Sequence, residues 1–335
     1  MSARAVVAAV VLSALLLASL AAATAIGSSG LAVGDVARAV LAHLGIGTNP
    51  LGPIDDGIVW ELRLPRVLTA AAVGAGLALV GAIMQALTAN QLADPYLLGL
   101  SSGASLGAVS VLLLGVSLLL PLAAFLGAIA ALAITLALAG ALGRITPSRT
   151  VLAGVAVSAL GTALTSFVIF WTARGDAYQD VLNWLLGSVA GARWPQVAVA
   201  VGGFVVLGIP LIANGRVLDA FAFGDRMAAS LGVNVTAVRW TLLGASAVLT
   251  GILVSVSGSI GFVGLVLPHA VRLIAGPRHG RLLPLVALVG AIYLVWADTA
   301  ARTLLAPREL PVGIVTALVG APVFALLLAR RRGGA

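Results

Sequence analysis

Two arginines lie three residues apart in the segment "ELRLPR", directly before an apolar stretch that begins at Val67. At this spacing Arg63 and Arg66 share one face of a helix start, whose first turn tolerates Pro65. A guanidinium group binds a carboxylate through two parallel hydrogen bonds, so the pair suits an acidic partner. Long basic side chains beside an apolar stretch also reach toward lipid headgroups, and the segment alone leaves both interpretations open.

A second group of charged residues lies near the carboxyl end, in "WADTAARTLLAPRELPVG". Asp298 and Arg302 stand at positions i and i+4, an orientation that favours an ion pair on a helix. Glu309 follows a few residues later. Whether this group meets the first pair depends on which side of the molecule each helix end occupies.

Residue types needed for catalysis or metal binding are scarce. The chain contains no Cys, which excludes a thiolate nucleophile, and no Lys, which excludes a normal Walker A nucleotide loop. It has no HExxH and no accessible Ser–His–Asp set, and His269 is expected to cap or pack near Arg272. We therefore predict a protein that is not an enzyme, with no catalytic residue, metal site or cofactor of its own.

The composition indicates what positions these charged residues. Hydrophobic residues make up 61% and charged residues 9% of the 335 residues, and the mean hydropathy is +1.15. Soluble proteins carry about 25% charged residues, and about 20 consecutive apolar residues span a bilayer. The sequence predicts an all-α polytopic membrane protein that forms one transmembrane domain over residues 1–335.

Ten apolar runs predict ten transmembrane helices. The first run has a basic start and the end "ASLAAATA", which resemble a signal peptide, but its length favours a retained helix. Residues 29–62 are more polar and predict an external loop with one amphipathic surface helix. Two boundaries, near 115–119 and 258–260, are marked only by Gly and Ser, so nine or eleven helices are also arguable. The runs cover residues 5–26, 67–89, 95–115, 119–142, 150–173, 194–213, 240–258, 260–276, 282–301 and 311–329.

Charge asymmetry orients these helices. If the N-terminus is cytoplasmic and ten helices alternate, the cytoplasmic ends carry twelve arginines and three aspartates, a net charge of +9. The external ends carry seven arginines and eight carboxylates, a net charge of −1. The positive-inside rule requires this bias, and both termini are then cytoplasmic. Arg63, Arg66 and Arg302 share the external side.

The segment "NQLADPYLLGLSSGASLGA" combines a turn signal with a packing signal. Asp94 and Pro95 resemble an N-cap and the first residue of a helix that restarts there. Gly99, Gly103 and Gly107 repeat every four residues, which favours close packing against another helix over a role in ligand binding.

The largest cytoplasmic loop, residues 214–240, is not simply polar. Its apolar residues recur at near-helical spacing, and one glycine splits the segment while another ends it. Short amphipathic helices need a cover for their apolar side, either lipid headgroups or a soluble partner subunit. The apolar residues are Leu218, Phe221, Met227 and Leu231, and the glycines are Gly224 and Gly232.

Six segments together resemble the FecCD-type permease subunit of type II ABC importers, a family that carries ferric siderophores, haem and cobalamin. The resemblance covers nearly the whole chain and is weakest over residues 1–58. Gln91 replaces the proline of the usual "NPLA", and Arg278 replaces the aspartate of "GPDHRR". The segments are "LRLPR", "GAIMQALTANQLADPYLLGLSSGASLGA", "LNWLLGS", "LDAFAFGDRMAASLGV", "GSIGFVGLVLPHAVRL" and "ELPVGIVTALVGAPVF".

The resemblance implies partners and residue roles. Two permease subunits, the same or homologous chains, would surround a pathway, with two ATPase subunits that bind ATP and Mg below and a substrate-binding protein above. Arg63, Arg66 and Arg302 would receive acidic side chains of the binding protein. Pro147 and Ser148 of "ITPSR" would narrow the cytoplasmic end. Residues 214–232 resemble coupling helices that contact the ATPase, with Leu218, Phe221, Gly224, Asp225, Arg226, Ala229, Leu231 and Gly232 as the candidate residues.

The sequence does not define the substrate. An iron-siderophore-type chelate is the expectation, and haem or cobalamin are the alternatives. Few ionisable residues lie inside the apolar runs, which disfavours an ion-coupled secondary transporter, and the motif matches disfavour a non-transporting scaffold. The expected location is the bacterial cytoplasmic (inner) membrane, with a periplasmic or lipid-anchored binding protein outside and no nucleic-acid partner.

Overall fold

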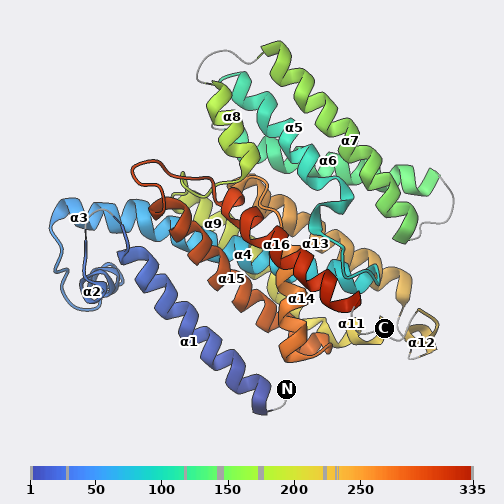
Figure 1. The fold of residues 1–335 in the computed structure, drawn as a ribbon, viewed down its shortest axis with the longest axis horizontal. Coiled ribbons are helices and arrows are strands. Elements are labelled where there is room, and N and C mark those ends of the chain that lie inside the picture. Colours follow the sequence, from blue (N-terminus) through green and yellow to red (C-terminus); the bar gives the residue numbers. More distant parts are fainter. Residues whose placement is uncertain are drawn as a thin grey trace.

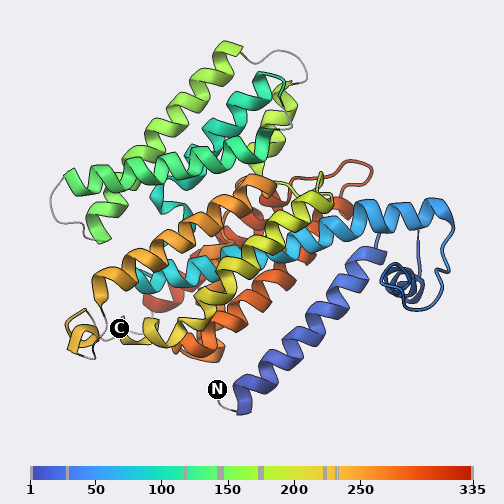
Figure 2. The same cartoon turned by 180° about the vertical axis from the view of Figure 1, so that it is seen from behind.

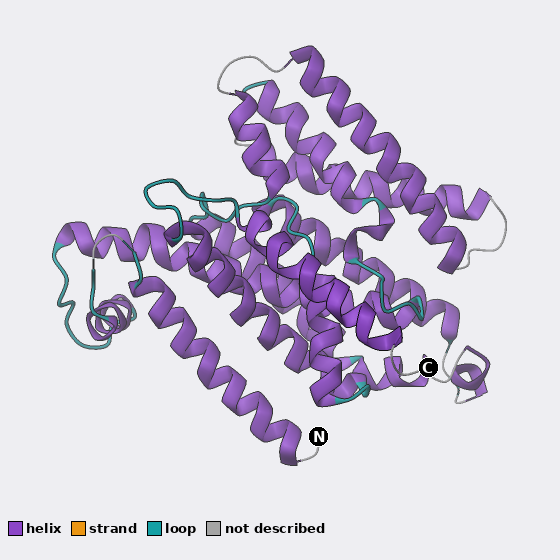
Figure 3. Ribbon diagram, in the orientation of Figure 1, coloured by secondary structure: helices purple, strands orange, loops and turns teal. Residues whose placement is uncertain are grey.

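The computed structural model describes residues 3–27, 30–116, 119–141, 147–172, 177–221, 225–230, 232 and 234–332. Every regular element among these residues is helical (Figure 3). The longer helices are α1 (Ala3–Ala25), α4 (Leu64–Leu87), α5 (Leu100–Leu113), α6 (Leu120–Ala141), α7 (Pro147–Thr172), α13 (Val235–Ser257), α14 (Val263–Ala275), α15 (His279–Thr303) and α16 (Val312–Arg332). The shorter ones are α2 (Val33–His43), α3 (Pro53–Gly57), η1 (Ile58–Arg63), η2 (Pro95–Leu98), α8 (Ala177–Leu186), α9 (Trp194–Gly203), η4 (Phe204–Gly208), α10 (Ile209–Ala213), α11 (Gly215–Phe221) and α12 (Asp225–Ser230).

Among the described residues, seven helical stretches are long and apolar enough to cross a membrane, and three shorter apolar helices accompany them. These ten stretches match the ten predicted runs, so the prediction of an all-helical polytopic membrane protein is confirmed. The soft boundaries are real breaks, since α5 ends at Leu113 before α6 begins at Leu120, and α13 ends at Ser257 before α14 begins at Val263. In the run at 260–276, α14 continues through Pro268.

The second span begins earlier than the sequence predicted. The surface helix α2 is present as expected, but α3, η1 and α4 form one helical stretch of 35 residues, Pro53–Leu87. Asp55 and Asp56 lie in its first turn, where carboxylates stabilise a helix N-terminus. The prediction of a loop up to residue 62 is therefore wrong, because these acids begin a helix. η1 has π-helical hydrogen bonding directly before Pro65, which lacks an N–H to donate.

Helix α4 lies at the centre of the molecule and is buried along almost its whole length. Glycines let neighbouring backbones approach it closely. A Cβ on Gly74 would lie 2.2 Å from the carbonyl oxygen of Gly290 in α15, and one on Gly81 would lie 1.9 Å from that of Gly264 in α14. Close backbone approach of this kind is how helices associate in lipid, so α4, α14 and α15 form a closely packed core.

Helices α5, α6, α7 and α8 form a second group beside this core (Figures 1 and 2). Asp94 Oδ1 accepts a hydrogen bond from Tyr96 N at 2.9 Å, so the predicted cap is confirmed at the start of η2. A Cβ on Gly103 would lie 2.3 Å from the carbonyl oxygen of Gly127, and one on Gly107 would lie 2.1 Å from that of Ala123. The predicted packing role of these two glycines is confirmed against α6.

The candidate functional residues fall at two opposite ends of the molecule. The C-terminal end lies near α11 and α12, and α1 starts on the same side of the molecule, whereas α3 and the turn after α15 lie at the other end (Figure 1). Helix α1 joins the two ends, starting near the first and bringing Ala25 to Arg63 at the second. The predicted topology requires this separation of coupling residues from docking arginines.

Candidate functional site

Arg66 is buried and binds two carboxylates. Its Nε and Nη2 donate to the two carboxylate oxygens of Asp298 at 2.8 and 2.9 Å, and its Nη1 donates to Glu309 Oε2 at 2.7 Å. Only 8% of the Arg66 side chain and 2% of the Asp298 side chain are exposed, against 48% for Glu309. The predicted pair of Asp298 with Arg302 is wrong, because Asp298 hydrogen-bonds with Arg66, 232 residues away in the sequence.

Arg63 and Arg302 hold the carboxyl end of α1. Arg63 Nη1 donates to the carbonyl oxygens of Thr24 at 3.3 Å and Ala25 at 3.0 Å, and Arg302 Nη2 donates to that of Ala23. The last carbonyls of a helix lack partners within the helix and carry its partial negative charge, so cations are favoured there. Gly27 leaves room for this arrangement, since a Cβ on it would lie 2.3 Å from Arg63 Nη2.

The structure thus brings the three predicted arginines to one end of the molecule, but it gives each of them acceptors within the chain. Arg63 and Arg66 are buried, and Arg302 is partly buried. Their partners differ, because Arg63 donates to the end of α1 and Arg66 to Asp298 of α15. Docking of a partner on these arginines stays a prediction, and it has to proceed from this internally bonded state.

We expect Arg63→Ala to lower the free energy of unfolding by about 1.5–3 kcal/mol, the usual size for hydrogen bonds to a charged group. The variant leaves the last carbonyls of α1 without the guanidinium. Thermal unfolding in detergent micelles measures the effect. Arg38→Ala is the matched control, because Arg38 is 66% exposed and its ion pair with Asp35 is a surface pair. Equal stability of the two variants would contradict a stabilising role for the hydrogen bonds from Arg63 to the end of α1.

The predicted coupling segment forms two short helices, α11 and α12, as the sequence indicated. Leu218 and Phe221 of α11 are buried in the core of this chain, so the expectation that lipid headgroups or a partner subunit must cover them is wrong. α11 is fixed further by Asp219, whose Oδ1 accepts from His279 N at 2.6 Å at the start of α15. Arg239 lies over the Phe221 ring, 5.4 Å from its centroid.

Helix α12 presents the side chains that remain available to a partner. Met227, Ala229 and Ser230 are exposed, while Ala228 is buried. Gly232 has a φ of 82°, and its N–H donates to Ala229 O at 3.0 Å, which fits the predicted end of the segment. Gly224 and Leu231 lie outside the described residues, as do the side chains of Asp225 and Arg226.

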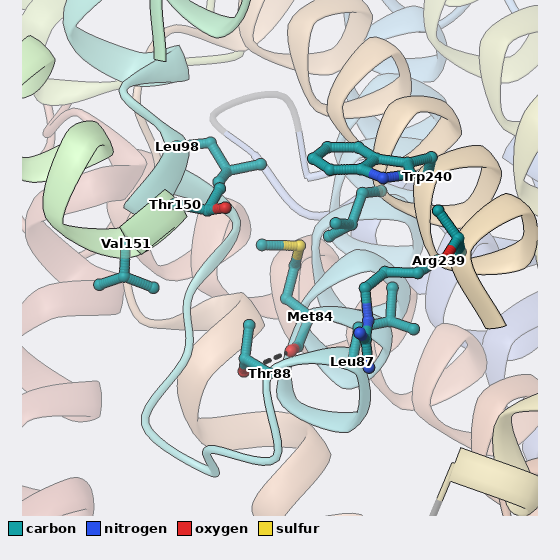
Figure 4. Close-up of a pocket in the computed structure, with 10 residues that line it drawn as sticks. Met84, Leu87, Thr88, Leu98, Thr150, Val151, Arg239 and Trp240 are labelled. Carbon is teal, nitrogen blue, oxygen red and sulfur yellow. Dashed lines mark hydrogen bonds between the residues drawn. The ribbon is translucent and has the colours of Figure 1, made fainter. Parts of the chain in front are cut away.

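At the predicted cytoplasmic gate, Pro147 begins α7, and Ser148 is exposed. The side chain of Pro147 lies outside the described residues. Next to it, a cavity of about 70 Å³ separates the starts of α7 and α13 from the end of α4 (Figure 4). Sites for small molecules occupy about 300–1,000 Å³, so this cavity is a packing gap between helices. Its lining includes Met84, Thr88, Thr150, Val151, Arg239 and Trp240.

A larger cavity of about 580 Å³ lies at the opposite end, beside the arginines. It is lined by α8, the end of α13 and the residues that lead into α16, with Glu309 at its edge. Its polar side chains come from distant parts of the chain and were not predicted as a group from the sequence. They are Asp180, Asn183, Ser188, Gln196, Ser255 and Glu309.

Two contacts, one at each end of the molecule, could not be predicted from residue spacing. Asp219 and His279 are 60 residues apart, and Arg66 and Glu309 are 243 apart, so no helical spacing relates them. The nearest available signal was the excess of acids on the external side, which indicates partners for the arginines without pairing them. Among the described residues, no group of three or more His, Cys, Asp or Glu is close enough to hold a metal ion.

Comparison with known proteins agrees with the motifs. The profile of the FecCD transport family matches residues 14–330. The Fe(3+) dicitrate transport system permease protein FecD of Escherichia coli is 44% identical over 280 residues, 82% of this chain and 86% of FecD. The vitamin B12 import system permease protein BtuC of Vibrio cholerae is 41% identical over 313 residues, 90% of this chain and 94% of BtuC.

A solved structure shares the whole architecture. An ABC transporter assigned to the metal-chelate type, in an inward-facing conformation, matches with a TM-score of 0.83 at 30% identity and covers 96% of this chain and 98% of that one. Together with the family profile and the two permease relatives, this match confirms the resemblance predicted from the six segments. The chain belongs to the FecCD transport family and is a transmembrane permease subunit of a type II ABC importer, not itself an enzyme.

Proposed function

We propose that this permease imports an iron-siderophore-type chelate, which an external substrate-binding protein delivers and a separate ATPase subunit drives through the membrane. The observation that carries the proposal is the match of the family to residues 14–330, which includes all the transmembrane stretches of the described residues except the start of the first, Ala5–Ala25. The relative FecD, named for Fe(3+) dicitrate and 44% identical, supports iron chelates as the substrate class. The 580 Å³ cavity at the end with the arginines supports entry of a large solute on that side.

Cobalamin is the second candidate substrate. BtuC proteins of Vibrio cholerae and Halobacterium salinarum, named for vitamin B12 or cobalamin import, are 41% and 43% identical to this chain. These values are close to that of FecD, so overall identity does not separate the two substrates. Haem is the further alternative within the same architecture.

The proposed complex has two permease subunits, two ATPase subunits and one binding protein. One permease domain spans residues 1–335 in the bacterial cytoplasmic membrane, with both termini and residues 214–232 on the cytoplasmic side. The exposed residues of α12 contact the ATPase, which binds ATP and Mg. Pro147 and Ser148 narrow the cytoplasmic end of the pathway. Arg63, Arg66 and Arg302 serve the docking of the binding protein at the other end.

Uptake in a cell that lacks its own chelate importers tests the substrate. The cell expresses this permease with its ATPase and binding protein and receives radioiron as a ferric siderophore, ferric dicitrate or haem, or radiocobalt as cobalamin. We expect accumulation of iron from a ferric siderophore and none of cobalamin. Accumulation of cobalamin alone would show that cobalamin, and not an iron-siderophore-type chelate, is the substrate. If no chelate accumulates, the import proposal is wrong.

A further inference from the structure

The two carboxylates that bind Arg66, those of Asp298 and Glu309, differ in their exposure to solvent. Asp298 binds Nε and Nη2 from inside the molecule, and only 2% of its side chain is exposed. Glu309 binds Nη1 from the outside, with 48% of its side chain exposed. It lies in the turn that joins α15 to α16, which projects at this end of the molecule (Figure 1).

This difference decides which contact can exchange. Removing Asp298 would leave a buried charge without its partner, which is strongly unfavourable. The side chain of Glu309 can rotate away from Arg66 and become hydrated, because exposed ion pairs contribute little to stability. A carboxylate that arrives from outside therefore competes with Glu309, and not with Asp298, for Arg66 Nη1. The exchange conserves charge, since one carboxylate replaces another on the same nitrogen.

We propose that Glu309 is an exchangeable internal ligand of Arg66, and that a carboxylate side chain of the external binding protein displaces it on docking. The inference rests on the proposed function, because it requires that such a protein docks at this end. Arg66 then changes neither its burial nor its bond to Asp298. The partner binds a guanidinium that Asp298 has already oriented.

The exchange of Glu309 for a carboxylate of the partner also affects the 580 Å³ cavity, because Glu309 lines it. Glu309, Leu310 and Pro311 line it together with Asp180 and Trp184 of α8. The next helix is packed against α8, since Gly313 N donates to Gly187 O at 3.1 Å. Release of Glu309 frees one side of the cavity edge while α16 stays attached to the end of α8. Docking is thereby linked to access to the cavity.

Binding of the purified binding protein that supports uptake tests the exchange, with the complete transporter in lipid nanodiscs. The variant is Glu309→Gln, and the control is Glu61→Gln, an exposed acid of η1 at the same end. We expect Glu309→Gln to bind about two- to five-fold more tightly than wild type, because the internal competitor loses its charge. The control should match wild type. Equal or weaker binding by Glu309→Gln would overturn the proposal.

A second readout follows the turn itself. The chain has no cysteine, so Leu310→Cys introduces a single site for a membrane-impermeant maleimide. We expect the binding protein to accelerate labelling, and Glu309→Gln to accelerate it without the binding protein. Labelling that neither change alters would contradict release of Glu309, even where the binding protein docks normally. If the binding protein fails to bind the wild-type transporter at all, the proposed docking itself fails.

Discussion

Arg66→Ala is expected to lower the free energy of unfolding by about 3–5 kcal/mol, the usual cost of removing one partner from a buried ion pair. The variant leaves the carboxylate of Asp298, 2% exposed, without its guanidinium. The contact joins the start of α4 to the end of α15, so its loss separates two helices of the core at one end. Unfolding in mixed micelles of increasing denaturing detergent measures the difference.

Two controls separate the buried contact from the exposed one. Glu309→Gln removes the charge of the half-exposed partner and should cost only about 0.2–1 kcal/mol. The double variant Arg66→Met with Asp298→Leu should recover most of the stability, because apolar residues of similar size often replace a buried ion pair without loss. If Arg66→Ala lowers the free energy of unfolding by less than about 1 kcal/mol, the Arg66–Asp298 pair behaves as a solvent-exposed pair, contrary to its burial.

Ala229→Asp is expected to abolish uptake while the protein still inserts and folds. Ala229 is exposed on α12, so the change costs this chain little stability, but it places a charge in the proposed contact with the ATPase. A carboxylate buried at an interface without a partner is strongly unfavourable. We expect loss of ATPase co-purification and loss of uptake together. Affinity purification of the tagged permease, followed by an uptake assay, measures both.

The matched control for this variant is Ala32→Asp, the same change at an exposed alanine before α2 at the other end. Aspartate is a favourable residue at a helix N-cap, so this variant should fold, assemble and transport as wild type. Normal ATPase recovery and uptake with Ala229→Asp would remove α12 from the proposed interface.

The sequence predicted the number of spans because length and hydropathy are local properties of a chain. It also predicted the cap at Asp94 and the glycine packing of α5, since both depend on residues a few positions apart. The start of the second span was missed for a local reason as well. The loop predicted for residues 29–62 includes Asp55 and Asp56, although acids in a first turn favour a helix.

The partners of the arginines could not be predicted in the same way. Spacing indicated a pair between Asp298 and Arg302, but helix packing brings Arg66 within 2.8 Å of Asp298 and directs Arg302 to the end of α1. Likewise, near-helical spacing showed that Leu218 and Phe221 share a face, yet it could not show that the face lies on the chain's own core. Which neighbour covers a helix face is a tertiary property that a single sequence leaves open.

Energy coupling in reconstituted vesicles tests the central claim most directly. Proteoliposomes contain the permease with its ATPase, carry ATP on the ATPase side, and receive the loaded binding protein on the other. The account predicts chelate uptake that requires both ATP hydrolysis and the binding protein and that persists when ionophores collapse all ion gradients. Uptake by the permease alone, without ATP and driven by an imposed proton or sodium gradient, would contradict it.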